Sequence, residues 1–265
     1  MTASAHHHHR HNHHAAQQHY YDEATNPEFE IRRPRGCGKI YEYLIEHKFR
    51  TGMSVLGLDV TGLTVLEVCC GSGLMTEALA RRGARVTGTD VSFQALVRAR
   101  ERARRYGFHA DFRIAAAEAL PFRDRSFDVV AVHDGLHHLE DPFQAIQEMA
   151  RVANRAVLIL EPARAALTGL AVHLGLAEEI EEAGNRVHRL AARDVSDRLR
   201  EAGFTQVAWR RTLMYYPHEP FAWFRWFDPP PCFGIFRTAF WMTNLALGHW
   251  GNKLALGASR NGAAH

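Results

Sequence analysis

The sequence lacks the features that mark several common protein classes. Its four cysteines have neither the spacing of a zinc site nor that of a disulfide framework. No apolar run is long enough to span a membrane, because the most apolar stretch, 233–247, is interrupted by Arg237 and Asn244. No hydrophobic signal region opens the chain. We therefore expect a cytoplasmic protein whose thiols stay reduced.

A strong charge of either sign is also missing. The net charge of +3 is too small to indicate a nucleic-acid-binding protein. The chain has 265 residues, of which 46% are hydrophobic, enough to bury the core of one domain with a lid. These exclusions leave a globular protein that acts on a small molecule.

Residues 1–19 are rich in histidine, alanine and glutamine and have too few apolar side chains to build a core. We expect a disordered tail. Transition-metal binding there is the weaker alternative, because histidines outside a fold lack the neighbouring groups that orient metal ligands. We therefore predict no metal centre.

A strand, a tight turn and a helix are predicted over residues 64–79. The stretch opens as a short apolar run, breaks at Gly71 and Gly73, and resumes with helical spacing. Glycines let a ligand approach the backbone closely, and the start of a helix offers unpaired N–H groups. The turn is therefore a predicted ligand site.

Two acidic residues and one missing glycine indicate which ligand the turn binds. Glu67 lies within the first strand, and Asp90 ends the next apolar run. An acid at that second position accepts hydrogen bonds from ribose hydroxyls. A dinucleotide site would need a glycine at the position of Thr76, so that the pyrophosphate could approach the backbone. The carboxylate of Glu67 would also repel a pyrophosphate. S-adenosylmethionine (SAM) has a ribose and positive charges but no phosphate, and so it fits better.

The stretch 65–73, VLEVCCGSG, resembles motif I of class I SAM-dependent methyltransferases, usually written VLDxGCGxG. Residues 55–160 are similar to the small-metabolite branch, which includes the ubiquinone and menaquinone methyltransferases and many natural-product enzymes. Cys69 stands where the family usually has its first glycine. Because a small residue can hold that turn, we expect distortion rather than loss.

The resemblance implies an α/β fold: a Rossmann-like, doubly wound sheet of seven strands, mostly parallel, with the last strand antiparallel. Residues 20–54 would form an N-terminal helical lid, and residues 55–265 the SAM-binding domain. An aromatic insertion at 217–251, before the last strand, would cap the substrate. The helix predicted over 92–106 carries several arginines, including Arg98 and Arg102, which we interpret as a solvated face.

The resemblance also assigns cofactor contacts. The glycine turn would approach the methionine part of SAM, and Asp90 would hold the ribose. Ala116 replaces the aspartate that usually bonds the adenine amino group, so the adenine would depend on neighbouring residues. The expected cofactor-binding residues are Glu67, Gly71, Ser72, Gly73, Asp90, Val91, Ala117, Glu118 and His133.

Candidate catalytic residues follow the fourth and fifth predicted strands. In a parallel sheet, ligands bind beyond the carboxyl ends of the strands, where His133, Asp134, His137 and Glu161 would lie. Histidine suits proton transfer near neutral pH. We expect His137 to act as base or substrate anchor, with His133 and Glu161 as alternatives. Structural roles, such as capping or packing, stay open for all of them.

The remaining predictions concern the acceptor. Expected substrate contacts are Tyr20 and Tyr21 in the lid, Asp134, His138, Trp223 and Trp226. The aromatic segment 221–250 is either an apolar pocket or an interface, so a homodimer stays open. We expect methyl transfer to carbon or oxygen of a small hydrophobic metabolite of polyketide, indole, quinone or prenyl type. The alternatives are a non-methylating protein of this fold, such as a cyclase or scaffold, and a nicotinamide-dependent oxidoreductase.

Overall fold

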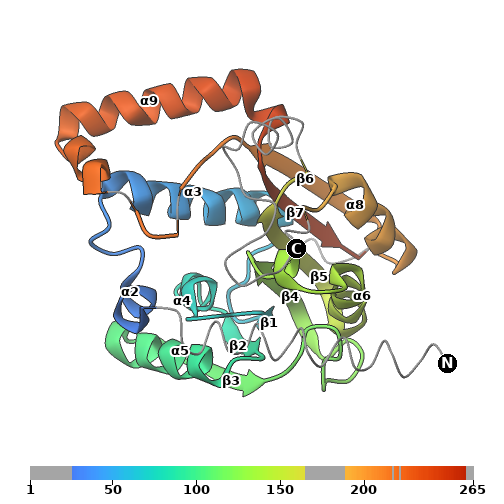
Figure 1. Cartoon of the computed structure of the whole chain (residues 1–265). Coiled ribbons are helices and arrows are strands. Elements are labelled where there is room, and N and C mark those ends of the chain that lie inside the picture. Colours follow the sequence, from blue (N-terminus) through green and yellow to red (C-terminus); the bar gives the residue numbers. More distant parts are fainter. Residues whose placement is uncertain (1–25, 165–188, 217, 221, 261–265) are drawn as a thin grey trace.

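The computed structural model describes residues 26–164, 189–216, 218–220 and 222–260. Its strands form a seven-stranded sheet in the order β3-β2-β1-β4-β5-β7-β6 (Figure 1). The strands are β1 (Thr64–Val68), β2 (Arg85–Asp90), β3 (Ala110–Ile114), β4 (Phe127–His133), β5 (Ala153–Pro162), β6 (Gln206–Thr212) and β7 (Lys253–Ser259).

The strand pairing confirms the predicted fold class. β1 pairs in parallel with both β2 and β4, and the parallel pairing continues to β3 on one side and β5 on the other. β7 is inserted antiparallel between β5 and β6. The chain winds outward from β1 to β3 and then returns to β4, so the strand order reverses between β1 and β4. Ligands of open α/β sheets bind at the carboxyl ends of the strands beside such a reversal.

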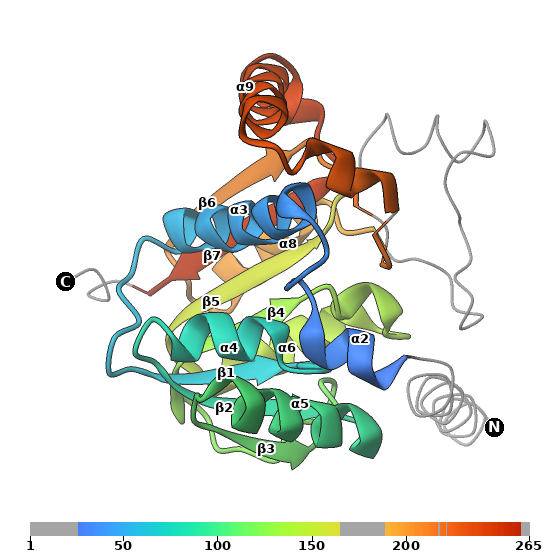
Figure 2. The same ribbon diagram turned by 90° about the vertical axis from the view of Figure 1, so that its left-hand side faces the viewer.

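Helices cover both faces of the sheet. α3, α4 and α5 lie on one face and α6 and α8 on the other (Figures 1 and 2). The helices are α2 (Pro27–Arg32), α3 (Lys39–Leu56), α4 (Leu74–Ala80), α5 (Phe93–Tyr106), α6 (Pro142–Val152), α8 (Ala192–Glu201) and α9 (Pro230–Leu247), with 3-10 turns η1 (Leu136–His138), η2 (Ala222–Phe227) and η3 (Gly248–Trp250). Each covered face has its own hydrophobic core.

Capping residues explain where the helices begin. Ser92 accepts a hydrogen bond from the backbone N–H of Ala95 at 2.9 Å, which starts α5 where the sequence predicted it. Asp141 does the same for Gln144 at 3.0 Å, and Pro142 occupies the first position of α6. These local signals place the two helices that follow β2 and β4.

The prediction of a solvated arginine face on α5 was wrong for Arg98 and Arg102, which are both buried. The Arg102 guanidinium is 3.1 Å from a Glu77 carboxylate oxygen and donates hydrogen bonds to the carbonyl oxygens of Glu30 and Arg33 at 2.7 and 2.6 Å. Helix α2 covers this part of α5, and the periodicity of α5 alone gives no sign of that cover. Arg102 therefore attaches the N-terminal region to the sheet domain.

Both regions expected to surround the substrate are helical. In the N-terminal region, α2 and α3 fall within the predicted lid, and α3 packs across β5 and β7. In the insertion, η2, α9 and η3 lie between β6 and β7 in the chain. Figure 1 shows α9 running alongside α3, on the side away from the sheet. None of the described helices is long and apolar enough to cross a membrane.

Candidate active site

The glycine turn after β1 has the backbone of a ligand-binding loop. Cys69 and Gly71 both have φ of 52°, and Gly73 has φ of 77° at the start of α4. A Cβ atom added to Gly71 would meet no atom within 4 Å. The turn therefore faces open space at Gly71, where a ligand can approach the backbone.

Cys69 adopts the left-handed conformation that a glycine would take at the same position. For a residue with a Cβ atom this conformation costs about 1 kcal/mol. Room for its side chain comes from Gly135 in the loop after β4, where an added Cβ would lie only 2.4 Å from Cβ of Cys69. The family's usual glycine is thus replaced by a cysteine, and a second glycine compensates on the opposite side of the contact.

Asp90 connects the end of β2 to this turn. One of its carboxylate oxygens accepts a hydrogen bond from the N–H of Gly71 at 2.9 Å, and the other accepts from Ser92 at 2.9 Å. Burial raises the pKa of the Asp90 carboxyl despite these N–H donors. Val91, the next residue, is half-buried. The acid predicted for the ribose is therefore fixed in place beside the turn.

Glu67 is almost completely buried within β1. Its side chain accepts a hydrogen bond from the Thr76 hydroxyl, so the residue that replaces the third glycine of a dinucleotide site holds this acid. Burial raises the pKa of Glu67 to about 8. A carboxyl group in that range gains from a cationic neighbour, because the cation offsets the cost of ionising it in the interior.

The environment of the Cys69 thiol shows that acidic groups gather at the turn. Its pKa is raised well above the ordinary value, first by burial and then by four carboxylates. They are Asp90, Glu118, Glu161 and Glu67. These acids come from β2, the loop after β3, β5 and β1. A site with this charge favours a cationic ligand and disfavours a phosphate.

Helix α2 reaches the turn through Ser72. The Ser72 hydroxyl is buried and donates a hydrogen bond to Glu30 at 3.0 Å. The same carboxylate lies 2.6 Å from Nε2 of His218, which precedes η2. No local pattern points to Glu30, because its partners are distant in the chain. Through Glu30, helix α2 and the start of the insertion both contact the glycine turn region.

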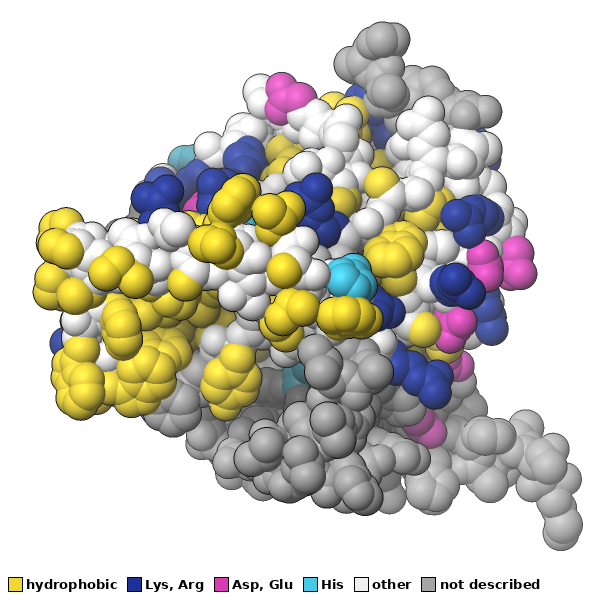
Figure 3. Space-filling view, turned by 90° about the horizontal axis from the view of Figure 1, so that it is seen from above, with side chains coloured by type: hydrophobic (Ala, Val, Ile, Leu, Met, Phe, Trp, Pro, Cys, Tyr) yellow, Lys and Arg dark blue, Asp and Glu magenta, His cyan; other side chains and the backbone are white. Residues whose placement is uncertain are grey.

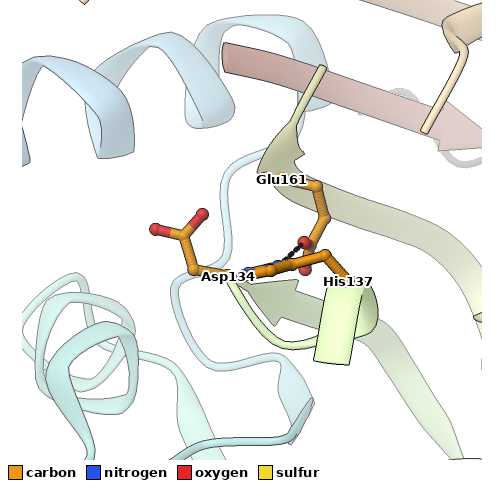
Figure 4. Close-up of side chains that lie close together, drawn as sticks. All are labelled: Asp134, His137 and Glu161. Carbon is orange, nitrogen blue, oxygen red and sulfur yellow. Dashed lines mark hydrogen bonds and ion pairs between the residues drawn. The ribbon is translucent and has the colours of Figure 1, made fainter. Parts of the chain in front are cut away.

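His137 and Glu161 form a buried pair at the carboxyl ends of β4 and β5. Nδ1 of His137 is 2.7 Å from one Glu161 oxygen, and the other oxygen accepts hydrogen bonds from the N–H groups of Gly135 and Leu136 at 2.7 and 2.8 Å. Figure 4 shows the two side chains pointing toward each other. With the Glu161 carboxylate as acceptor, Nδ1 donates and Nε2 carries the basic lone pair.

Asp134 lies in a second polar group beside that pair. Its carboxylate is 2.6 Å from Nζ of Lys48 and 3.8 Å from Nζ of Lys253, and it accepts a hydrogen bond from the Tyr216 hydroxyl at 3.1 Å. Burial lowers the pKa of Lys48 to about 8, against the attraction of Asp134. Sequence reasoning missed Lys48, Tyr216 and Lys253 because they lie on α3, after β6 and on β7.

His133 is the least suited of the predicted catalytic residues to proton transfer. Its ring packs 5.0 Å from that of Phe49, and its Nε2 is 3.4 Å from the Asp134 carboxylate. Burial and the charge of Lys48 keep the pKa of His133 well below its usual value. The ring is therefore neutral at physiological pH.

Asp134, His137 and Glu161 place three possible ligand atoms within 4.8 Å of one another. The Glu161 oxygens, however, accept from backbone N–H groups and face His137, and Asp134 pairs with lysine. In Figure 4 the Asp134 carboxylate points away from the other two side chains. These contacts engage both Glu161 oxygens, Nδ1 of His137 and one Asp134 oxygen, so we assign no metal to the group.

The other predicted contacts are placed less decisively. Tyr20 and Tyr21 lie outside the described residues. The ring of His138 is 4.0 Å from that of His137, and Ala117 is buried after β3. Trp226 is 77% exposed, and its contact with substrate stays a prediction. Trp223 is 44% exposed and packs edge-on against Phe224, so its contact with substrate stays a prediction.

Comparison with known proteins decides the class of domain. Residues 66–160 match the family described as Methyltransferase domain. The resemblance to SAM-dependent methyltransferases is confirmed. A ubiquinone biosynthesis O-methyltransferase of Nitrosomonas europaea is 42% identical over 90 residues, which make up 34% of this chain and 38% of that protein. One of Idiomarina loihiensis is 42% identical over 91 residues, 34% of this chain and 37% of that protein.

The matched stretch spans less than two fifths of these relatives, but likeness in structure extends further. Magnesium protoporphyrin IX methyltransferase from Synechocystis has a TM-score of 0.61 at 21% identity, over 92% of this chain and 98% of that one. The cyclase SpnF has a TM-score of 0.56 at 21% identity, over 83% and 82%. At this identity the comparison shows the shared fold.

Proposed function

We propose that this protein transfers a methyl group from SAM to an oxygen or carbon atom of a small hydrophobic acceptor. The observation that carries the proposal is the gathering of Glu67, Asp90 and Glu118 around the glycine turn. SAM is cationic at its sulfonium and ammonium groups, has a ribose and lacks phosphate. A nicotinamide dinucleotide would bring its pyrophosphate to the same acidic turn, which is unfavourable.

The residues at the turn fit the parts of SAM in a consistent order. Asp90, at the end of β2, is the group that would hold the ribose hydroxyls. Glu67 would supply negative charge to the methionine end, and the backbone at Gly71 leaves room for it. When bound, SAM supplies an electrophilic methyl group that an acceptor attacks in line. The protein's part is then to align the two molecules and exclude water.

His137 is our candidate for the base when the acceptor atom is a hydroxyl oxygen. Its basic Nε2 can take the acceptor's proton, and Glu161 stabilises the resulting imidazolium through Nδ1. Lys48 places an amine with a lowered pKa beside Asp134 at the same edge of the sheet. A cationic amine there favours an acceptor that carries negative charge as it reacts.

The acceptor class follows from the names of the curated relatives, which are O-methyltransferases of ubiquinone biosynthesis. We therefore propose a phenolic or quinone-type acceptor first. Polyketide, indole and prenyl acceptors form the second group, because the site residues alone do not distinguish between them. All of these are hydrophobic and carry a carbon or oxygen that can be methylated.

Two measurements test the proposal. Calorimetry should show SAM binding and no tight NAD binding. Transfer of tritium-labelled methyl groups should then be detected with at least one catechol, polyketide, indole or prenyl compound. Tight NAD binding without SAM binding would contradict the proposal. SAM binding without transfer to any of the compounds would support instead a non-methylating role, such as that of a cyclase or scaffold.

A further inference from the structure

Helix α9 is apolar on both of its sides, although only one side is covered. Phe233, Phe236 and Phe240 are half-buried and pack against the ring of Tyr43 on α3, with centroid distances of 5.9, 6.1 and 5.6 Å. None of the residues of α9 is fully buried. Helices that are hydrophobic all round are normally enclosed by protein or lipid. The uncovered side of α9 therefore requires an explanation.

The uncovered side, which we call the outer face, consists of Ile235, Met242 and Leu245, with Trp241 at its edge. Their exposed fractions are 71%, 59%, 73% and 61%. The spacing of Ile235, Met242 and Leu245 puts these side chains on one side of a helix. Figure 3 shows hydrophobic side chains gathered along α9, with Lys and Arg side chains beside them.

Exposed tryptophans also flank the helix. Trp226 in η2, just before α9, is 77% exposed, and Trp250 in η3, just after it, is 50% exposed. Tryptophan is enriched where apolar and aqueous phases meet, because its ring is apolar and its N–H is polar. An apolar helix with exposed tryptophans at both of its ends is typical of helices that lie in a membrane surface.

The charge of this region points to an anionic partner. Residues 229–265 contain no Asp or Glu, and the guanidinium of Arg237 packs beside the rings of Tyr43 and Phe233. Arg237 lies on α9 itself and is exposed. A two-fold symmetric contact between the outer faces of two copies would set this acid-free stretch against itself and offer Arg237 no anionic partner. An anionic lipid surface instead complements both the apolar stripe and the cations.

We propose that α9 binds the surface of anionic lipid bilayers, with its outer face inserted among the lipids and its axis in the membrane plane. The packing of Phe233, Phe236 and Phe240 on α3 fixes the orientation of this face relative to the rest of the protein. α3 also carries Lys48, which contacts Asp134 at the candidate active site. Membrane binding would thus hold the site next to a reservoir of hydrophobic acceptors.

The test is co-sedimentation with two kinds of vesicle, one of phosphatidylcholine alone and one of phosphatidylcholine mixed with phosphatidylglycerol. We expect binding to the mixed vesicles, weakening with salt, and a blue shift of tryptophan emission on binding. The double variant Ile235→Glu/Met242→Glu should bind at least roughly tenfold more weakly, because two apolar side chains no longer enter the lipid.

The control is Ile114→Glu, which places one such charge on a similarly exposed residue of β3, at the opposite edge of the sheet. It should bind as the wild type does. Circular dichroism and thermal unfolding of each variant show whether it is folded. Arg237→Gln should reduce the preference for phosphatidylglycerol while leaving the blue shift in place.

Three results would overturn the proposal. In the first, the wild type binds neither kind of vesicle. In the second, Ile114→Glu loses as much binding as Ile235→Glu/Met242→Glu does. In the third, the wild type is a dimer that binds no vesicles, and the Ile235→Glu/Met242→Glu variant is a monomer. The last would assign the outer face to a second copy of the chain. Vesicle binding needs neither SAM nor acceptor, so its outcome is independent of the proposed methyl transfer.

Discussion

The two sides of the candidate site contain buried ionisable groups in contrasting arrangements. Around the glycine turn, carboxyl groups lie near one another, and burial raises the pKa of both Glu67 and Asp90. Around Asp134, a carboxylate is surrounded by Lys48, Lys253 and the Tyr216 hydroxyl. The pKa of Asp134 is well below its ordinary value because these cations outweigh its burial.

The contrast indicates which side is completed by a ligand. The group around Asp134 balances its own charges, so it can hold an acceptor in place without large rearrangement of protons. The group around Glu67 has a carboxyl whose ionisation is opposed by burial, and a bound cation would relieve that cost. The carboxyl groups at the turn therefore favour binding of the cationic SAM. The residues on the opposite side would orient the acceptor and include the candidate base.

The largest expected effect concerns the base on the acceptor side. His137→Ala should lower kcat for a hydroxyl acceptor by roughly 10²–10⁴-fold, because the proton then has no positioned acceptor. SAM affinity, measured by calorimetry, should change little, since the cofactor side is untouched. The control is His109→Ala, which removes an exposed histidine just before β3. Equal rates for wild type and His137→Ala on a hydroxyl acceptor would remove His137 from the mechanism.

The second prediction addresses the contact between the two sides. Gly135→Ala should reduce the free energy of unfolding by about 3 kcal/mol, because the new Cβ would lie 2.4 Å from Cβ of Cys69. In a Cys69→Gly background the same change should cost much less. Urea unfolding of the wild type, the two single variants and the double variant measures this coupling. Strict additivity would mean that the Cys69–Gly135 contact is not the source of the loss.

The same contrast explains which parts of the fold and of the candidate site could be predicted from the sequence. Glu67, Asp90 and the glycines of the turn lie within a short stretch, 67–90, and are placed by one strand–turn–helix–strand unit. Periodicity and glycine positions are sufficient to predict such a unit. The seven-stranded, mostly parallel sheet and its antiparallel last strand followed from the resemblance to a known family, and the structure confirms both.

The acceptor side depends on contacts between distant segments, which no local pattern encodes. Lys48 meets Asp134 and Tyr216 only after α3 and the segment following β6 have packed at the same sheet edge. Arg102 was misjudged for the same reason, because α2 covers it from far away in the chain. The His137–Glu161 pair was partly predictable, since each residue follows a central strand and parallel strands end together.

The third prediction concerns the acidic side and pH. The pKa of Glu67 in the folded protein, about 8, is above its ordinary value of 4.5. Between these values the folded protein keeps a proton that the unfolded chain has lost, so this residue's contribution makes the free energy of unfolding fall as pH rises. Comparing wild type with Glu67→Gln by thermal unfolding at several pH values should isolate this effect.

The Gln variant cannot ionise, so its stability should decline less over that pH range. Saturating SAM should also reduce the wild-type decline, because the cation favours the carboxylate form. Parallel pH curves for wild type and Glu67→Gln would show that Glu67 is ionised across the range, and the contrast between the two sides would then disappear. Glu161→Gln provides a comparison on the acceptor side.

The smallest expected effect tests whether the Ser72–Glu30 hydrogen bond couples α2 to the glycine turn. Ser72→Ala removes the hydroxyl that donates to Glu30 at 3.0 Å, which should cost about 1 kcal/mol of stability. Hydrogen exchange should localise the loss to α2, because Glu30 is its contact with the turn and Arg102 still holds the helix from the other side. Thr238→Ala, an exposed hydroxyl on α9, is the control. Faster exchange spread evenly over the sheet would show that Ser72 supports the turn itself and does not connect it to α2.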